Sequence, residues 1–139
     1  MDYEFYLKIN NEIPQGGGIK IYDGTSSFTF SKVWSFQSIF EISESSTITY
    51  YVSGSTAYIN NIEKIVAGTV IGIGIQATNP GAANTYSIEI STYKTAVTNT
   101  STDQIDVTNP KASIEIISTT SSLSSYTVAA TTGSILAYT

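Results

Sequence analysis

The stretch Thr69-Val70-Ile71-Gly72-Ile73-Gly74-Ile75 decides the fold class of this chain. Isoleucine occupies every second position from residue 71, and the stretch contains no charged residue and no proline. A period of two indicates a β-strand, because successive side chains of a strand point to opposite faces of a sheet. We therefore predict a buried strand here. The two alternate glycines favour a close approach of another backbone or sheet to this strand.

The same alternation continues on both sides of this stretch. Further strands are predicted over residues 2–9, 19–22, 28–42, 48–52, 86–90, 105–107, 114–116, 126–130 and 136–138. Asp23-Gly24 predicts a hairpin turn, because glycine tolerates the positive φ angle that tight turns need. The threonine-rich segment 95–104 is predicted to be a loop.

One segment departs from the period of two. Its apolar residues recur with the spacing of an amphipathic helix: Tyr58, Ile59, Ile62, Ile65 and Val66. Ser55 or Thr56 would cap the start of such a helix, and Gly68 would end it. Because isoleucine and asparagine are poor helix formers, we expect at most one short helix in the chain.

These elements predict an all-β protein. The 139 residues fit one domain, and no break in composition and no run of charge divides the chain. About eight to ten short strands separated by turns are typical of a sandwich or barrel of antiparallel strands. We predict a single antiparallel β-sandwich domain over residues 1–139, with a jelly-roll-like arrangement.

Three residue types are absent from the chain: cysteine, histidine and arginine. Their absence removes the usual ligands of zinc, copper, haem and iron–sulfur centres. It also removes cysteine nucleophiles, histidine bases and any disulfide within the chain. We therefore expect no cofactor, no metal and no enzyme activity.

Charge and hydropathy argue against two further classes. The net charge is −5 and the six lysines are scattered singly, so no basic patch is available for nucleic acid. The longest apolar stretch, from Ile65 to Ile75, is too short to span a bilayer as a helix. The first residues lack the basic and apolar regions of a secretory signal, so we expect a protein made without that export route.

Three short motifs have a structural interpretation that we favour over a chemical one. Residues 91–94, Ser-Thr-Tyr-Lys, match the Ser-x-x-Lys pattern of penicillin-recognising enzymes but continue an alternating strand, which favours a strand end. The glycines of residues 16–18 lack the Gly-Lys-Ser/Thr that completes a phosphate cradle, which favours a loop. Asp103, Asp106 and Asn109 offer oxygen ligands for a weak calcium site, although a solvated acidic loop is favoured.

A fourth motif concerns modification. Asn99-Thr100-Ser101 is an N-glycosylation sequon in a predicted surface loop, which makes Asn99 a candidate glycosylation site.

Aromatic residues are concentrated in one segment. Residues 28–40 hold four of the five phenylalanines and the only tryptophan. Filling of the core is the favoured interpretation, because large aromatic side chains usually contribute there. The alternative is that some of them anchor a subunit interface or stack on sugars. The candidate interface residues are Trp34, Phe36, Phe40 and Tyr138.

Few charges are available to keep the predicted strands from pairing with other chains. Six lysines offer little protection to sheet edges. The uncharged run from Ile65 to Ile75 has strong β propensity and would promote aggregation if exposed. Such a chain stays soluble most easily when neighbouring subunits cover its edges and patches, which favours an oligomer or lattice.

In composition the chain resembles β-rich structural virion proteins of archaeal viruses from hot environments. The resemblance covers the whole chain and rests on strands rich in Ile, Ser, Thr and Tyr such as residues 69–75, lysine without arginine, and no cysteine. It implies a capsid, turret or other virion component, located in the virion. Its partners would be copies of itself or other structural subunits.

Two alternatives remain open, both at an extracellular surface. One is a carbohydrate-binding or adhesin-like module that stacks glycans on Trp34 and on tyrosines. The other is a filament subunit that donates strand 2–10 or 134–139 to a neighbour.

Overall fold

The computed structural model describes residues 2–38, 48–82, 84–106, 111–116, 127–132 and 135–138; for Ser38 and the last three ranges it describes the backbone alone. These ranges contain ten β-strands and no helix. The strands are β1 (Asp2–Lys8), β2 (Gly17–Tyr22), β3 (Thr29–Ser38), β4 (Thr49–Ser53), β5 (Thr56–Ile62), β6 (Val70–Thr78), β7 (Asn84–Tyr93), β8 (Lys111–Ile116), β9 (Thr127–Thr132) and β10 (Ile135–Tyr138).

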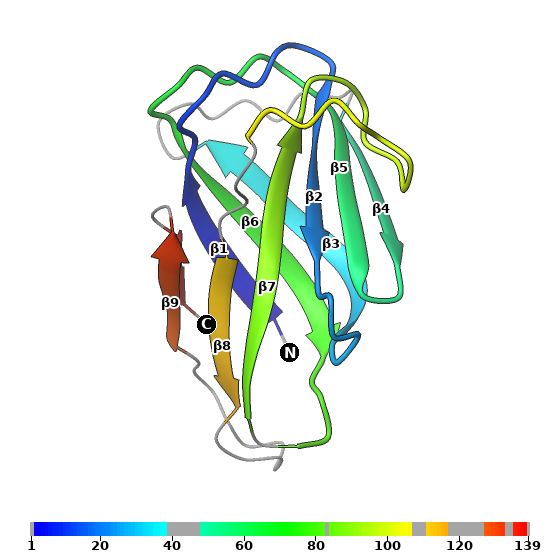
Figure 1. Ribbon diagram of the computed structural model, residues 1–139, viewed down its shortest axis with the longest axis vertical. Helices are drawn as coiled ribbons and strands as arrows, with labels where there is room; N and C mark the ends of the chain where they lie inside the picture. Colours follow the sequence, from blue (N-terminus) through cyan, green and yellow to red (C-terminus); the bar gives the residue numbers. More distant parts are fainter. Residues whose placement is uncertain are drawn as a thin grey trace.

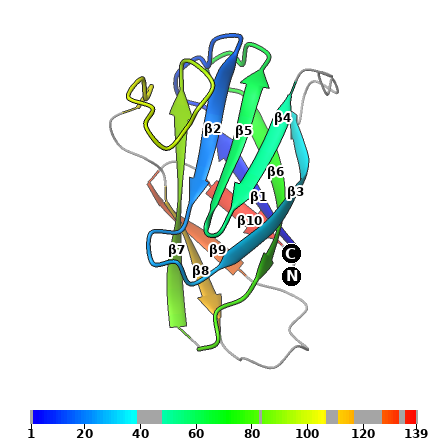
Figure 2. The same cartoon turned by 90° about the vertical axis from the view of Figure 1, so that its right-hand side faces the viewer.

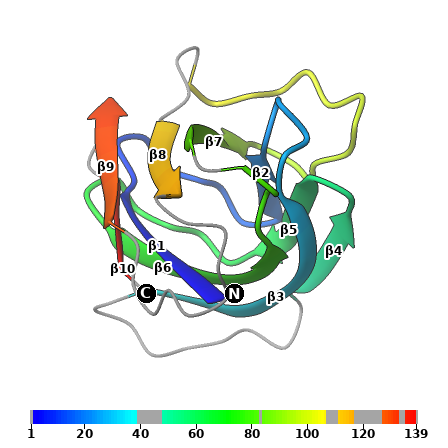
Figure 3. The ribbon, with the colours of Figure 1, turned by 90° about the horizontal axis from the view of Figure 1, so that it is seen from below.

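The strands form two facing layers (Figure 1). They hydrogen-bond in the continuous order β3-β6-β1-β10-β9-β8-β7-β2-β5-β4, and every pairing in this order is antiparallel. One layer contains β3, β6 and β1, and the other contains β7, β2, β5 and β4. Figure 3 shows β8, β9 and β10 connecting the two layers on one side. On the other side, the two end strands β3 and β4 approach each other (Figure 2).

This arrangement confirms the predicted all-β antiparallel sandwich. Every described strand lies within about three residues of a predicted one, except β5, which was expected to be a helix. The jelly-roll-like arrangement is not confirmed. A jelly roll consists of two sheets, whereas the described strands hydrogen-bond in one continuous order.

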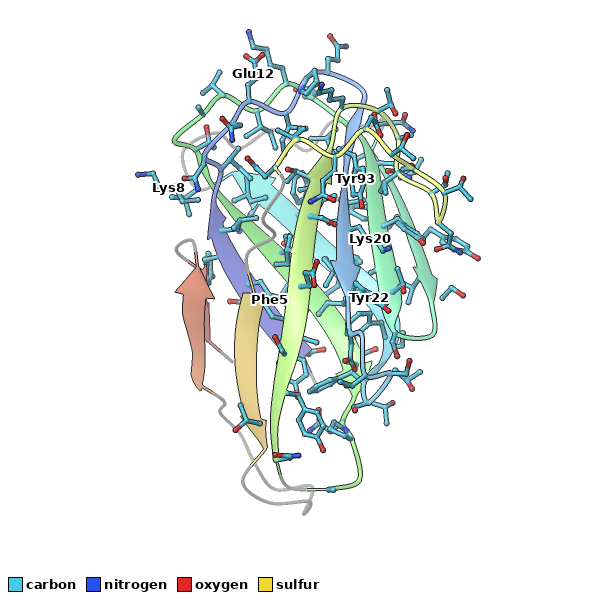
Figure 4. All side chains as sticks on the ribbon, viewed as in Figure 1. Phe5, Lys8, Glu12, Lys20, Tyr22 and Tyr93 are labelled. Atoms are coloured by element: carbon cyan, nitrogen blue, oxygen red, sulfur yellow. The ribbon has the colours of Figure 1, made fainter. Side chains whose placement is uncertain are left out.

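A single apolar core lies between the two layers. From one layer β6 contributes Ile71, Ile73 and Ile75, and from the other β2 contributes Ile19 and Ile21; each of these side chains is at most 1% exposed. Figure 4 shows Phe5 of β1 in the same space. Each fully buried isoleucine contributes roughly 1.5–3 kcal/mol, so this shared core is what holds the layers together.

The helix expected over residues 58–66 is wrong, because residues 56–62 form strand β5. Two features produce the misleading spacing. Tyr58 and Ile59 point to opposite faces of the strand, yet both are buried. Asn61 then adopts a positive φ of 57°, and the pairing register with β2 shifts next to it, so that Ile62 is buried again. Burial on both faces and this irregularity together imitate a helical period.

The hairpin expected at Asp23-Gly24 is also wrong. β2 pairs with β5 and β7, whereas β3 pairs with β6, so residues 23–28 cross from one layer to the other. The strand expected over residues 105–107 is not formed at Ile105, which lies in a loop and donates a backbone hydrogen bond to Thr92; Val107 lies outside the described residues.

Candidate functional site

The structure separates the four candidate interface residues. Trp34 is 40% exposed, whereas Phe36 is 5% exposed and belongs to the core, so Phe36 offers no surface to a partner. Phe40 lies outside the described residues. Tyr138 is placed through its backbone, which pairs with Glu4 of β1. The favoured core interpretation of the aromatic segment thus holds for Phe36 and fails for Trp34.

Trp34 lies against the outer side of β6. A Cβ atom built on Gly74 would lie 2.6 Å from Cε2 and Cζ2 of Trp34 and 2.8 Å from its Cδ2. These similar distances to adjacent ring atoms show that the indole covers Gly74 with its face. The glycine therefore makes room for an aromatic ring, where the sequence pattern predicted another backbone or sheet.

Tyr6 of β1 extends the aromatic surface along β6. A Cβ atom on Gly72 would lie 3.2 Å from Cε1 of Tyr6 and 3.9 Å from Cγ of Gln37. The Tyr6 hydroxyl donates a hydrogen bond of 2.9 Å to Oε2 of Glu4. This hydrogen bond, together with partial burial and the charge of Glu4, raises the pKa of the Tyr6 phenol. We call this surface, formed by Trp34, Tyr6, Glu4 and Gln37 over the two glycines, the tryptophan platform.

A second aromatic surface lies on the outer side of the opposite layer. The ring of Tyr51 on β4 stacks on that of Tyr58 on β5, with centroids 5.9 Å apart and planes 17° apart. On β2, the Lys20 ammonium lies 4.9 Å from the centroid of the Tyr22 ring (Figure 4). Tyr51 is 60% exposed and Tyr22 is 39% exposed. We call these four residues the tyrosine face.

The register brings the tyrosine face together. Tyr51 pairs with Tyr58, Tyr58 pairs with Lys20, and Lys20 pairs with Ser91 of β7, so one row of side chains crosses four strands. The sequence could not reveal this row, because β2 pairs with β5 and β7 across long intervals of the chain, although β4 and β5 are consecutive. The adjacent pair Tyr50-Tyr51 in a strand without charge was the available signal.

A loop of residues 94–106, here called the strap, covers one end of the tyrosine face. Val97 packs with Tyr58 and Tyr93, and all three are buried. Asn60 holds the Val97 backbone from both sides: its Oδ1 accepts from the amide at 2.7 Å, and its Nδ2 donates to the carbonyl at 3.0 Å. Burial by the strap and the nearby phenols of Tyr51 and Tyr93 raise the pKa of Tyr58.

The candidate glycosylation residue lies on this strap. Asn99 is exposed, and its Oδ1 accepts a hydrogen bond from the Tyr58 hydroxyl. The sequon therefore occupies a surface position, as the sequence predicts, and its amide oxygen is bound to the tyrosine face. Ser101 of the same sequon accepts a hydrogen bond of 2.8 Å from the Thr98 amide.

Asp103 and Asp106, for which a solvated acidic loop was favoured over a calcium site, make hydrogen bonds that stabilise the strap. Oδ2 of Asp103 accepts hydrogen bonds from the amide and the hydroxyl of Thr95, at 2.7 and 2.6 Å. The Thr95 hydroxyl is the main cause of a lowered pKa of Asp103. Asp106 accepts from the side chain of Asn11, while Asn109 lies outside the described residues. Within the described ranges, no group of three or more acidic side chains is arranged to hold a metal ion.

The Ser-x-x-Lys motif ends strand β7, as predicted. Ser91 is 5% exposed, and its Oγ lies 3.5 Å from the Tyr93 hydroxyl oxygen. Lys94 is exposed and follows the last residue of the strand. The loop expected over residues 16–18 is formed only at Gly16, which lies in a turn, because Gly17 and Gly18 are the first residues of strand β2. A Cβ atom on Gly18 would collide with Asn60 and would lie 3.0 Å from the Val97 amide, so this position makes room for the strap.

Comparison with known proteins yields no relative. Scans against protein-family models, curated proteins and solved structures each found no match to this chain. Among the residues that the structure describes, none belongs to a helix long and apolar enough to cross a membrane.

Proposed function

We propose that the protein is a structural subunit that assembles with copies of itself through β-strand pairing, as a component of a capsid, turret or other part of a virion. The observation that carries this proposal is strand β4, which ends the described strand order. Its sequence, Thr-Tyr-Tyr-Val-Ser, contains no charge and no proline.

The two end strands differ in their protection. β3 carries Lys32, and its pairing with β6 shifts register twice, which bends an edge away from other strands. β4 pairs with β5 over five consecutive residues without a shift. A straight, uncharged end strand offers its backbone groups to another chain. Two β4 strands related by a two-fold axis would pair antiparallel, giving the same contacts to both subunits.

The tyrosine face extends this edge into a broader contact surface. Tyr51 belongs to β4 itself, and Tyr22 lies two strands away in the same layer. Tyrosine is enriched at protein interfaces because its ring is apolar and its hydroxyl can remain hydrated. The strand-donation alternative gains no such support, since β1 and β10 are each paired on both sides within the chain.

The test is self-association in solution. The wild-type protein is expected to form dimers or larger species in sedimentation velocity between about 1 and 100 μM, a range that brackets a dissociation constant near 10 μM. Tyr51→Lys should remain a monomer, because a lysine on an edge strand opposes pairing. On assembly, the amides of β4 should exchange with solvent more slowly.

Val66→Lys is the matched control. Val66 is 55% exposed, lies outside every strand, and gains the same charge in the substitution. It should associate like the wild-type chain. A wild-type chain that remains monomeric over the whole range contradicts the proposal, and so does association that Tyr51→Lys and Val66→Lys weaken equally.

A further inference from the structure

We propose that the tryptophan platform is a binding site for a neutral saccharide, with Trp34 as the stacking surface and Glu4 and Gln37 as hydrogen-bonding partners. This inference does not depend on assembly, because the platform lies on the layer opposite to β4 and the tyrosine face.

The first support is that β6 has glycine at the two positions beneath the platform. Gly72 and Gly74 alternate with the buried Ile71, Ile73 and Ile75, so the missing side chains belong to the outer side of the strand. Glycine inside a strand weakens it, because glycine loses more backbone entropy on folding than other residues and packs no side chain. The gain is a flat aromatic surface: Trp34 lies over one glycine, and Tyr6 borders the other.

The second support is the exposure of the indole. Its inner face covers Gly74, and the side chain remains 40% exposed. The face of an aromatic ring carries negative potential and the C–H groups on the apolar side of a pyranose carry positive potential, so the two stack favourably. Small-molecule sites combine such an apolar surface with a few placed polar groups.

Polar groups of the required kind border the rings. Glu4 pairs with Gly74 in the register, and Gln37 pairs with Gly72, so one lies on either side of β6. The carboxylate of Glu4 accepts hydrogen bonds, and the amide of Gln37 both accepts and donates. The hydroxyl groups of a sugar need this combination. The Tyr6 hydroxyl already donates to Glu4, which holds the carboxylate beside the ring.

The same residues argue against other occupants. A nucleic acid would bring its phosphates close to Glu4 and Asp2, on a chain whose net charge is −5. A protein partner that covered the platform would remove the Glu4 carboxylate from water. The hydrogen bond described for this carboxylate comes from the Tyr6 hydroxyl, which is a neutral donor. Burying a charge without a charged partner is unfavourable. A saccharide leaves such a surface partly hydrated.

Trp34 is the only tryptophan, so its fluorescence reports on the platform directly. Titration of the wild-type protein with cellohexaose, maltohexaose and N-acetylchitohexaose should change the emission with at least one of them, with a dissociation constant of about 1 mM or tighter. Gly74→Ala should weaken that binding at least about tenfold, because the new methyl group lies where the indole now rests. Gly81→Ala is the matched control, since a Cβ there meets nothing within 4 Å.

A second variant separates loss of binding from loss of fold. Gln37→Ala removes an exposed side chain outside the core and should weaken binding about threefold or more while leaving the circular dichroism spectrum unchanged. Tyr51→Lys, which opposes assembly, should bind the sugar like the wild-type chain. The proposal is overturned if none of the three oligosaccharides changes the emission, or if Gly74→Ala and Gln37→Ala bind as tightly as Gly81→Ala.

Discussion

Asp23 shows how one carboxylate can organise a connection between the two layers. Its side chain is fully buried and accepts four hydrogen bonds: from the amide and hydroxyl of Thr25, at 3.0 and 2.7 Å, and from the amides of Ser27 and Phe28, both at 2.7 Å. Phe28, fixed in this way, packs edge-on against Tyr3 and Tyr86 in the core. The residue that the sequence marks as a turn former thus directs the chain from β2 into β3.

Asp23→Ala should therefore lower the free energy of unfolding by about 3 kcal/mol, because three backbone amides lose their acceptor inside the protein. For a chain of this length, that corresponds to a fall in Tm of roughly 10 °C in thermal denaturation. The free energy of unfolding of Asp23→Asn should lie between those of the wild-type protein and Asp23→Ala, because the asparagine amide provides only one acceptor oxygen. Asp2→Ala, at an exposed strand end, is the control and should change stability by less than about 0.5 kcal/mol; an equal effect of both alanine variants would rule out the role of Asp23.

Asp103 makes the hydrogen bonds of the strap dependent on pH. Its pKa is lowered from the usual value of 3.8, chiefly by the Thr95 hydroxyl. A carboxyl group whose pKa is lower in the folded state stabilises that state above its unfolded pKa, and this contribution is lost as the pH falls through the folded value. The interaction is therefore complete above about pH 5 and disappears in acid, below 3.8.

An NMR titration of the Asp103 carboxyl carbon should give a midpoint below 3.8. Thr95→Val removes the hydroxyl at nearly constant shape and should raise that midpoint, although the Thr95 amide still donates. Thr85→Val on β7 leaves the strap untouched and should not move it. A wild-type midpoint at or above 3.8 would show that the Thr95 hydrogen bonds do not persist in solution.

At the scale of the element, the sequence predicted strands well wherever the residue type alternates along the chain. β1 alternates between buried and more exposed positions, and in β6 isoleucine alternates with glycine although residues 71–75 are all buried, so the period of two identified both strands. β5 was missed because its apolar residues do not alternate. Tyr58 is covered on the outer side by the strap, which arrives from residues nearly forty positions later, so no local window contains the cause.

The candidate surfaces depend on pairings that are equally remote in sequence. Trp34 reaches Gly74 because β3 and β6 are neighbours, and Tyr51 reaches Lys20 only through the register of β4, β5 and β2. The sequence did indicate one part of the tryptophan platform, namely the two glycines at outward positions of an otherwise apolar strand. It could not say that an aromatic ring fills the space. Trp34 and Phe36 are two residues apart and would share a face of a regular strand, but a register shift between Val33 and Ser35 leaves Trp34 exposed and Phe36 buried.

At the scale of the whole molecule, the two candidate surfaces face away from each other. The tyrosine face adjoins the straight end strand β4, and the tryptophan platform lies over the centre of the opposite layer. A subunit that pairs through β4 can therefore keep the platform open to solvent. Assembly and sugar binding are compatible in one chain, and a substitution on one surface should leave the other unchanged. This independence is what allows the two proposals to fail separately.

The shared core leads to a last prediction, about folding. The described core residues of both layers form one cluster, so neither layer can lose its partner without exposing buried isoleucines. We expect unfolding in urea to be a single cooperative transition, as for most domains of this size. Trp34 fluorescence reports on one layer, and hydrogen exchange of the Ile59 amide on β5 reports on the other. Both probes should give the same free energy of unfolding within about 0.5 kcal/mol, and a lower value at Ile59 would instead mean that the layer carrying the strap opens first as a separate unit.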